Sequence, residues 1–141
     1  MSTLKLKQAQ DLIQAAFVAA RAKGYKPMGV VVVDAAGQVK AAAREDGATA
    51  LRIDIATGKA SAAAGMGVSS RVLTQRAKDL PAFMTALASV SSQKFLPQTG
   101  AVLILDADGA VLGAAGASGG TGDEDEEICI AGIAAAGLRH G

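Results

Sequence analysis

Residues 6–24 carry apolar side chains at the spacing of a helix. Those that recur at intervals of three and four residues are Leu6, Ala9, Ile13, Ala16, Phe17 and Ala20. Positions with this spacing lie on one face of an α-helix, which is typical of a helix packed against a core. Gly24 suits the end of this helix, because glycine readily takes the left-handed conformation that closes many helices.

Two later segments have the pattern of β-hairpins. In each, a short run of apolar residues leads into a turn that contains Asp and Gly, and a second run follows. Asp and Gly are typical of the tight turns that join antiparallel strands. The first predicted hairpin has strands 28–33 and 38–43 around the turn 34–37, and the second has strands 101–105 and 110–115 around the turn 106–109.

The two predicted hairpins resemble each other in sequence. A shift of 72 positions places Val30 on Val102 and Asp34 on Asp106. Two hairpins that use the same turn chemistry explain this match. The alternative is a duplicated unit whose strands lie near each other in one sheet, and the residues leave both interpretations open.

Helices are predicted between and after the hairpins. Alanine-rich stretches without proline favour helix, serine is a good N-cap, and proline is tolerated in a first turn. The predicted helices are 51–64 before a glycine break at 65–67, a short helix from Ser69 or Ser70 to 77, a helix from Pro81 to about 89, and a closing helix 123–138 after a loop at 116–122. This order predicts one α+β domain, residues 1–141, whose central antiparallel sheet is built from two β-hairpins and flanked by helices.

Composition narrows the class of protein. Half of the 141 residues are hydrophobic but only 3% are aromatic, so we expect a core of small aliphatic side chains. A formal net charge of +1 provides no field that attracts nucleic acid or an anionic membrane. Residues 1–7 lack the apolar stretch of a secretory signal, and no run approaches the roughly 20 apolar residues that span a bilayer. We therefore expect a cytoplasmic protein that binds neither nucleic acid nor membrane.

The glycine-rich segment 116–122 is a candidate binding loop, because it joins a predicted strand to a predicted helix and lets the backbone approach a bound group. It lacks the Lys-Ser/Thr ending of a P-loop. Residues 123–127 are all acidic and would repel a phosphate. These carboxylates either complement the helix dipole or, if Asp123 shares a helix face with Glu126 or Glu127, form a hard-cation site.

Few residues suit catalysis. The only histidine, His140, is next to the last residue, so no Ser-His-Asp triad is expected. The only cysteine, Cys129, cannot form an internal disulfide or a zinc site of several thiolates, and its apolar neighbours predict a buried thiol. Asp54 and Lys59 stand in an Ala-rich segment, where either needs a partner or a ligand if it points toward the sheet.

The chain resembles the GlcG/HbpS family, which includes the C-terminal domain of PduO-type proteins, over almost its whole length. The segments that carry the resemblance are VVDAAG (32–37), REDG (44–47), IDIA (53–56) with Lys59, and GAAGASGGT (113–121) followed by Asp125. The last segment is the most specific. The resemblance implies an antiparallel sheet flanked by helices, in agreement with the residue pattern, and a homo-oligomer: a dimer, tetramer or octamer.

The resemblance also implies a ligand pocket. By motif position, its ligand-binding residues are Arg44, Asp46, Asp54, Lys59, Ser118, Gly119, Gly120, Thr121 and Asp125. Some relatives bind haem or iron, so the implied cofactor is haem, with iron or another divalent cation as a further candidate. Haem needs an apolar slot, an axial ligand and cations for its propionates. The first predicted helix has no histidine, whereas some haem-binding relatives use one there, so the axial ligand stays unassigned.

Three functions remain open at this stage. The first is a small-ligand-binding protein that holds haem or another tetrapyrrole in a pocket or at a subunit interface, with Arg or Lys meeting its carboxylates. The second is a small enzyme of a catabolic operon acting on an organic acid, in which Asp54 or Asp125 takes a proton and Lys59 or Arg44 orients the carboxylate. The third is a structural or regulatory oligomer without catalysis. The first and second require Asp54, Lys59 and the loop 118–121 to meet in one recess.

Overall fold

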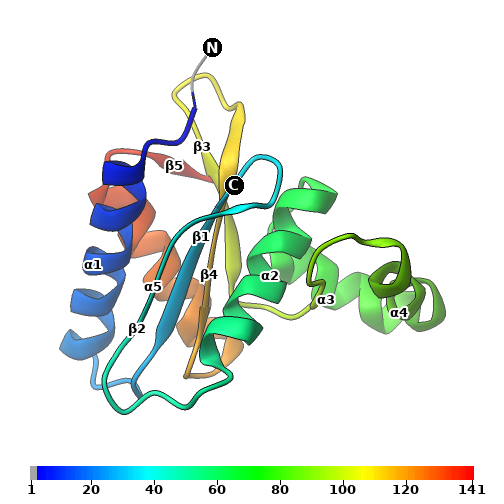
Figure 1. Ribbon diagram of the computed structural model, residues 1–141, viewed down its shortest axis with the longest axis horizontal. Helices are drawn as coiled ribbons and strands as arrows, with labels where there is room; N and C mark the ends of the chain where they lie inside the picture. The colour runs from blue at the N-terminus through cyan, green and yellow to red at the C-terminus, as the bar shows by residue number, and fades with distance from the viewer. Residues whose placement is uncertain (1–2) are drawn as a thin grey trace.

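The computed structural model describes residues 3–141, so Met1 and Ser2 of the predicted domain and amino-terminal segment lie outside the described residues. Within residues 3–141, five helices and five strands follow one another (Figure 1). They are α1 (Leu6–Ala22), β1 (Gly29–Asp34), β2 (Val39–Arg44), α2 (Arg52–Met66), α3 (Ser70–Asp79), α4 (Pro81–Val90), β3 (Ala101–Leu105), β4 (Val111–Ser118), α5 (Gly122–Ala135) and β5 (Arg139–His140).

The strands form one antiparallel sheet in the order β2-β1-β4-β3-β5. Both predicted hairpins are present, and Asp34 and Asp106 accept backbone N–H bonds within their turns. The hairpins join through β1 and β4, where Val31 pairs with Gly116. The strands of the two similar hairpins therefore lie beside each other in one sheet, and the predicted α+β class is confirmed.

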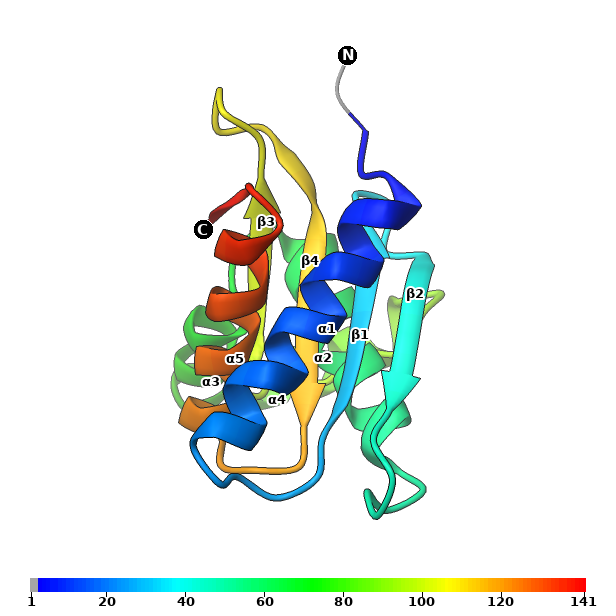
Figure 2. The ribbon, with the colours of Figure 1, turned by 90° about the vertical axis from the view of Figure 1, so that its left-hand side faces the viewer.

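Helices cover both faces of the sheet (Figure 2). On one face α1 and α5 bury a core that includes Leu12, Ile128 and Val32. On the other face α2 packs its alanines against Val31 and Val33. Because β1 is covered on both faces, its apolar run is unbroken rather than alternating.

Close approach of α2 to the sheet depends on small residues. A Cβ at Gly116 of β4 would lie 2.5 Å from the carbonyl oxygen of Ala56 in α2. Ala56, Ala60 and Ala63 form the buried face of the helix. The helices α3 and α4 follow α2 and extend to one side of the sheet (Figure 1).

Several predicted boundaries are wrong. Residues 116–118 belong to β4 rather than to a loop, because Gly116 and Ser118 pair with β1. The helix α2 extends two residues beyond its predicted end, to Met66, and Gly67 of the expected break caps it with a left-handed φ of 71°. The closing helix ends at Ala135 rather than at 138, and Arg139 and His140 add a short edge strand beside β3.

Within residues 3–141 there is no helix whose length and apolar content would let it cross a membrane.

Candidate functional site

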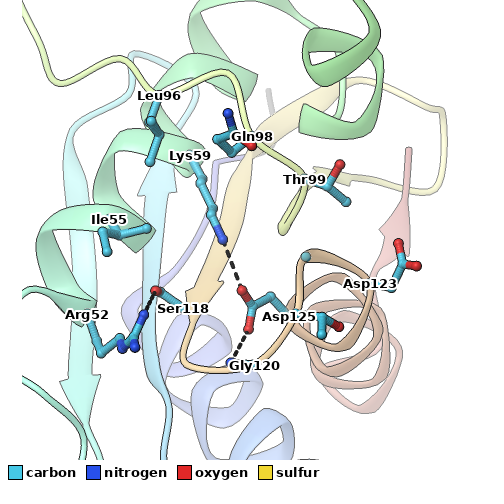
Figure 3. A pocket seen from close by; sticks show the side chains of 12 residues that line it. Arg52, Ile55, Lys59, Leu96, Gln98, Thr99, Ser118, Gly120, Asp123 and Asp125 are labelled. Carbon is cyan, nitrogen blue, oxygen red and sulfur yellow. Dashed lines mark hydrogen bonds and ion pairs between the residues drawn. The ribbon is translucent and has the colours of Figure 1, made fainter.

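A recess of about 440 Å³ lies where the end of β4, the start of α5 and the side of α2 meet the segment before β3 (Figure 3). We call it the β4–α5 recess. Its lining residues are Arg52, Ile55, Lys59, Leu96, Gln98, Thr99, Ser118, Gly120, Thr121, Gly122, Asp123 and Asp125. Lys59 therefore meets residues of the loop 118–121 in this recess, whereas Asp54, expected beside them, does not line it.

Lys59 and Asp125 form a buried ion pair in this recess. Lys59 Nζ donates to Asp125 Oδ2 at 2.9 Å and to the carbonyl oxygen of Ala117 at 3.1 Å. Only 7% of the Lys59 side chain and 2% of the Asp125 side chain are exposed. The other carboxylate oxygen, Oδ1, accepts the N–H of Gly120 at 3.0 Å. Burial raises the pKa of Asp125, and the Lys59 ammonium opposes that rise.

The pair connects the two helix layers across the end of the sheet, since α2 and α5 cover opposite faces. Gly100, directly before β3, makes this contact possible. A Cβ at Gly100 would lie 2.7 Å from Lys59 Nζ and 3.0 Å from Asp125 Cβ. The φ of Gly100 is +134°, a conformation that other residues rarely adopt.

Arg52 is the second cation of the recess. Its Nη1 donates to Ser118 Oγ at 3.2 Å, and the residue is only partly buried. Among residues 3–141 no carboxylate lies within salt-bridge distance of this guanidinium. Its positive charge nevertheless lowers the pKa of Asp125, against the effect of burial. Arg52 therefore has guanidinium donors that the fold leaves for another partner.

The start of α5 is closed by its own side chains. Thr121 Oγ1 accepts the N–H of Glu124 at 3.1 Å, and Glu124 Oε1 accepts the N–H of Thr121 at 2.9 Å. This capping box satisfies two backbone donors that would otherwise be free. Thr121 therefore shapes the wall of the recess by fixing the first turn of α5.

The hard-cation site considered for the acidic segment is not present. Asp123 and Glu126 both pair with Arg71, whereas Glu127 bonds to Lys23 and Tyr25. Among residues 3–141, no group of three or more His, Cys, Asp and Glu side chains could hold a metal ion.

Three residues assigned to the pocket by resemblance lie elsewhere. Asp54 is exposed and pairs with Lys94. Arg44 bonds to the carbonyl oxygen of Ala48 at 2.7 Å, and it lines, with Asp46, a different hollow beside the end of α1. Asp54 follows Arg52 by two positions, and residues two apart on a helix do not share a face.

Gly119 lies beside the β4–α5 recess without lining it. A Cβ at this position would be 2.4 Å from the carbonyl oxygen of Pro27. Glycine therefore allows the chain to pass close to the segment that joins α1 to β1. Ser118, Gly120 and Asp125 do line the recess, as the motif implies.

Sequence reasoning missed Arg52, although the signal was present. Arg52, Ile55 and Lys59 are separated by three and four residues, so all three fall on one helix face. Gln98 and Thr99 come from an irregular segment before β3 and had no comparable signal. A search along the helical repeat outward from Lys59 would have found Arg52.

The remaining chemical candidates lie outside the recess. Burial raises the pKa of the Cys129 thiol, which is fully enclosed and contacts the carbonyl oxygen of Gly100. The predicted burial of the thiol is therefore confirmed. His140 is exposed on β5 and does not line the recess.

Comparisons with known proteins agree with this architecture. The family model described as haem degrading protein HbpS-like matches residues 4–134. A structure of a PduOC:heme complex matches with a TM-score of 0.84 and 26% identity, covering 97% of each chain. A structure of HbpS matches with a TM-score of 0.82 and 29% identity, covering 95% of this chain and 90% of that one.

A double mutant of HbpS from Streptomyces reticuli matches with a TM-score of 0.82 and 30% identity, covering 95% of this chain and 87% of that one. No curated protein sequence matches the chain. The family model spans nearly the whole sequence, and the matching structures share its fold. The chain therefore belongs to the HbpS-like family.

Proposed function

We propose that this protein binds a small molecule through a carboxylate held by Arg52, and that the ligand is haem or another tetrapyrrole. The observation that carries the proposal is the partly buried Arg52 guanidinium, which faces the β4–α5 recess without a carboxylate partner among residues 3–141. Arginine binds carboxylates through paired, charge-assisted hydrogen bonds. The relative solved as a PduOC:heme complex supports a tetrapyrrole as the ligand class.

The recess fits the carboxylate part of such a ligand and not its iron. Arg52 and Lys59 are the cations that a propionate would meet. None of the lining residues is a His, Cys, Met or Tyr, the residue types that usually ligate haem iron, and only Ile55 and Leu96 offer large apolar side chains. The recess also has no aromatic wall for a flat ring.

We therefore place the macrocycle over the mouth of the recess, where a second copy of the chain completes the site. This arrangement extends the expectation of a homo-oligomer and of binding partly at a subunit interface. The single, buried Cys129 forms no disulfide, which is compatible with the proposed cytoplasmic location. Sedimentation of the protein with and without haemin tests the oligomer: a monomer under both conditions would contradict it.

Titration with haemin tests the role of Arg52. We expect a saturable shift of the Soret band, and we expect Arg52→Gln to weaken binding about tenfold or more, since charge-assisted hydrogen bonds contribute roughly 1.5–3 kcal/mol. Arg44→Gln is the matched control, because Arg44 lies outside the recess. Haemin dimethyl ester, which lacks free carboxylates, should bind wild type and Arg52→Gln equally weakly. Equal affinity of wild type and Arg52→Gln for haemin itself would refute the proposal.

The second candidate is an enzyme acting on an organic acid. The buried Lys59–Asp125 pair beside Arg52 favours it, because enzymes use such paired titratable groups for proton transfer. Arg44 and Asp54, considered earlier for this chemistry, lie outside the recess. The roles consistent with the geometry are therefore carboxylate binding by Arg52 and proton transfer by Asp125.

A further inference from the structure

We propose that Lys59 is a nucleophile that forms an imine with the carbonyl group of a small oxo acid whose carboxylate is bound by Arg52. This inference rests on the proposed carboxylate role of Arg52 and adds covalent chemistry to the same recess. Its structural basis is the position of one buried amine between a carboxyl group and an open cavity.

The amine of Lys59 faces the β4–α5 recess and carries one more N–H than its partners use. An ammonium group has three donors, and two are taken by Asp125 and the carbonyl oxygen of Ala117. Figure 3 shows the side chain crossing from α2 toward α5, with Arg52 and Ser118 on the neighbouring wall. A Cβ at Gly100 would lie 2.7 Å from Nζ, so glycine at this position lets the amine reach the recess.

Asp125 is placed to take and return the proton that the reaction requires. Its Oδ2 lies 2.9 Å from Lys59 Nζ, within the distance for direct proton transfer. Burial raises the pKa of Asp125, which makes the carboxyl a better proton acceptor. Transfer of one proton across this hydrogen bond leaves a neutral amine on Lys59, the form in which lysine is nucleophilic.

The reaction balances without an oxidant or another reactant. Lys59 passes a proton to Asp125, and the amine nitrogen then forms a bond to the carbonyl carbon of the oxo acid. The π electrons move to the carbonyl oxygen, which takes the proton back from Asp125 to give a carbinolamine. The hydroxyl group leaves as water, with a proton delivered through Asp125 from the same nitrogen, and Lys59 is left joined to the ligand by a carbon–nitrogen double bond.

The inference is tested by trapping the imine. Native protein is incubated with pyruvate and sodium cyanoborohydride, then digested and mapped by mass spectrometry. We expect one reduced pyruvate per chain on Lys59 and its loss in Lys59→Arg, which keeps a cation beside Asp125 but has no primary amine. Lys94→Arg is the matched control, because Lys94 is exposed and does not line the recess, and this variant should keep the adduct.

A second arm separates this inference from the proposed function. Propanal has a carbonyl group but no carboxylate, so its reaction with Lys59 does not require Arg52. Labelling of Lys59 by pyruvate that falls about tenfold in Arg52→Gln, with propanal labelling unchanged, supports both proposals. If propanal labels Lys59 but pyruvate does not, the proposed role of Arg52 is refuted and the role of Lys59 as a nucleophile is supported. Absence of label on Lys59 with both reagents, or surface lysines labelled equally fast, would overturn the inference while haemin binding stayed a separate result.

Discussion

Breaking the Lys59–Asp125 pair from one side should destabilise the protein strongly. Lys59→Met leaves the Asp125 carboxylate, whose side chain is 2% exposed, with only the Gly120 N–H as a partner. Asp125→Asn leaves the buried Lys59 ammonium with only the Ala117 carbonyl oxygen. Removing one partner of a buried ion pair typically costs about 3–5 kcal/mol, because the other charge stays desolvated. We expect each single variant to lose free energy of unfolding in that range.

The double variant should recover much of this loss. In Lys59→Met with Asp125→Asn no charge is buried, and the asparagine Oδ1 can still accept the N–H of Gly120. The remaining cost is that of the lost hydrogen bonds, about 1–3 kcal/mol. The double variant should therefore be more stable than either single variant. The coupling energy between the two substitutions should be much larger than that of an exposed ion pair.

Urea denaturation followed by far-ultraviolet circular dichroism measures these differences, since the chain has no Trp for fluorescence. The variants should share one slope with urea concentration, so that changes in midpoint report stability alone. Single variants that each lose less than about 1 kcal/mol and add independently would show that solvent reaches the pair. That result would refute the buried ion pair as described and would remove the basis for imine formation at Lys59.

Two further predictions test the elements around the recess. Thr121→Ala should lower the free energy of unfolding by about 1 kcal/mol through loss of the α5 cap, and Thr121→Ser should lower it less. Equal stability of the wild type and both variants in thermal melts would contradict the capping box. Gly132→Ala should cost about 1–3 kcal/mol or more in urea denaturation, because its Cβ would lie 2.5 Å from the carbonyl oxygen of Leu12 in α1. Gly65→Ala is the control, because its Cβ would lie in open space, and it should leave the free energy of unfolding unchanged or raise it by about 0.5–1 kcal/mol. An equal loss of stability in both variants would refute the close packing of α1 on α5.

The main elements of the fold were predictable because local patterns agree with the tertiary structure. An apolar run before a turn that contains Asp and Gly specifies each hairpin, and the spacing of apolar residues specifies α1. The misplaced boundaries involve residues whose structure depends on distant partners. Gly116 belongs to a strand only because β1 pairs with it, and Arg139 forms an edge strand only because β3 is adjacent.

The site was predictable only in part for a similar reason. Lys59 and Ser118 could be grouped from the family motif, but Asp54 could not be separated from them without the helix geometry that turns it to solvent. Arg52 was predictable from its spacing to Lys59. Gln98 and Thr99 reach the recess through an irregular segment, and no sequence pattern specifies the path of such a segment.

The desolvation cost of burying the Lys59–Asp125 pair is itself an argument that the pair meets a ligand. A pair of apolar side chains of similar volume connects two layers at least as well, since the desolvation of two charges offsets most of their attraction. Here the charges are retained at the one place where α2, α5 and the sheet end meet an open recess, next to Arg52. Gly100, with its positive φ, leaves the space that the ammonium occupies. An arrangement that burial alone does not favour, placed beside a cavity and a free guanidinium, is typical of a group that meets a ligand.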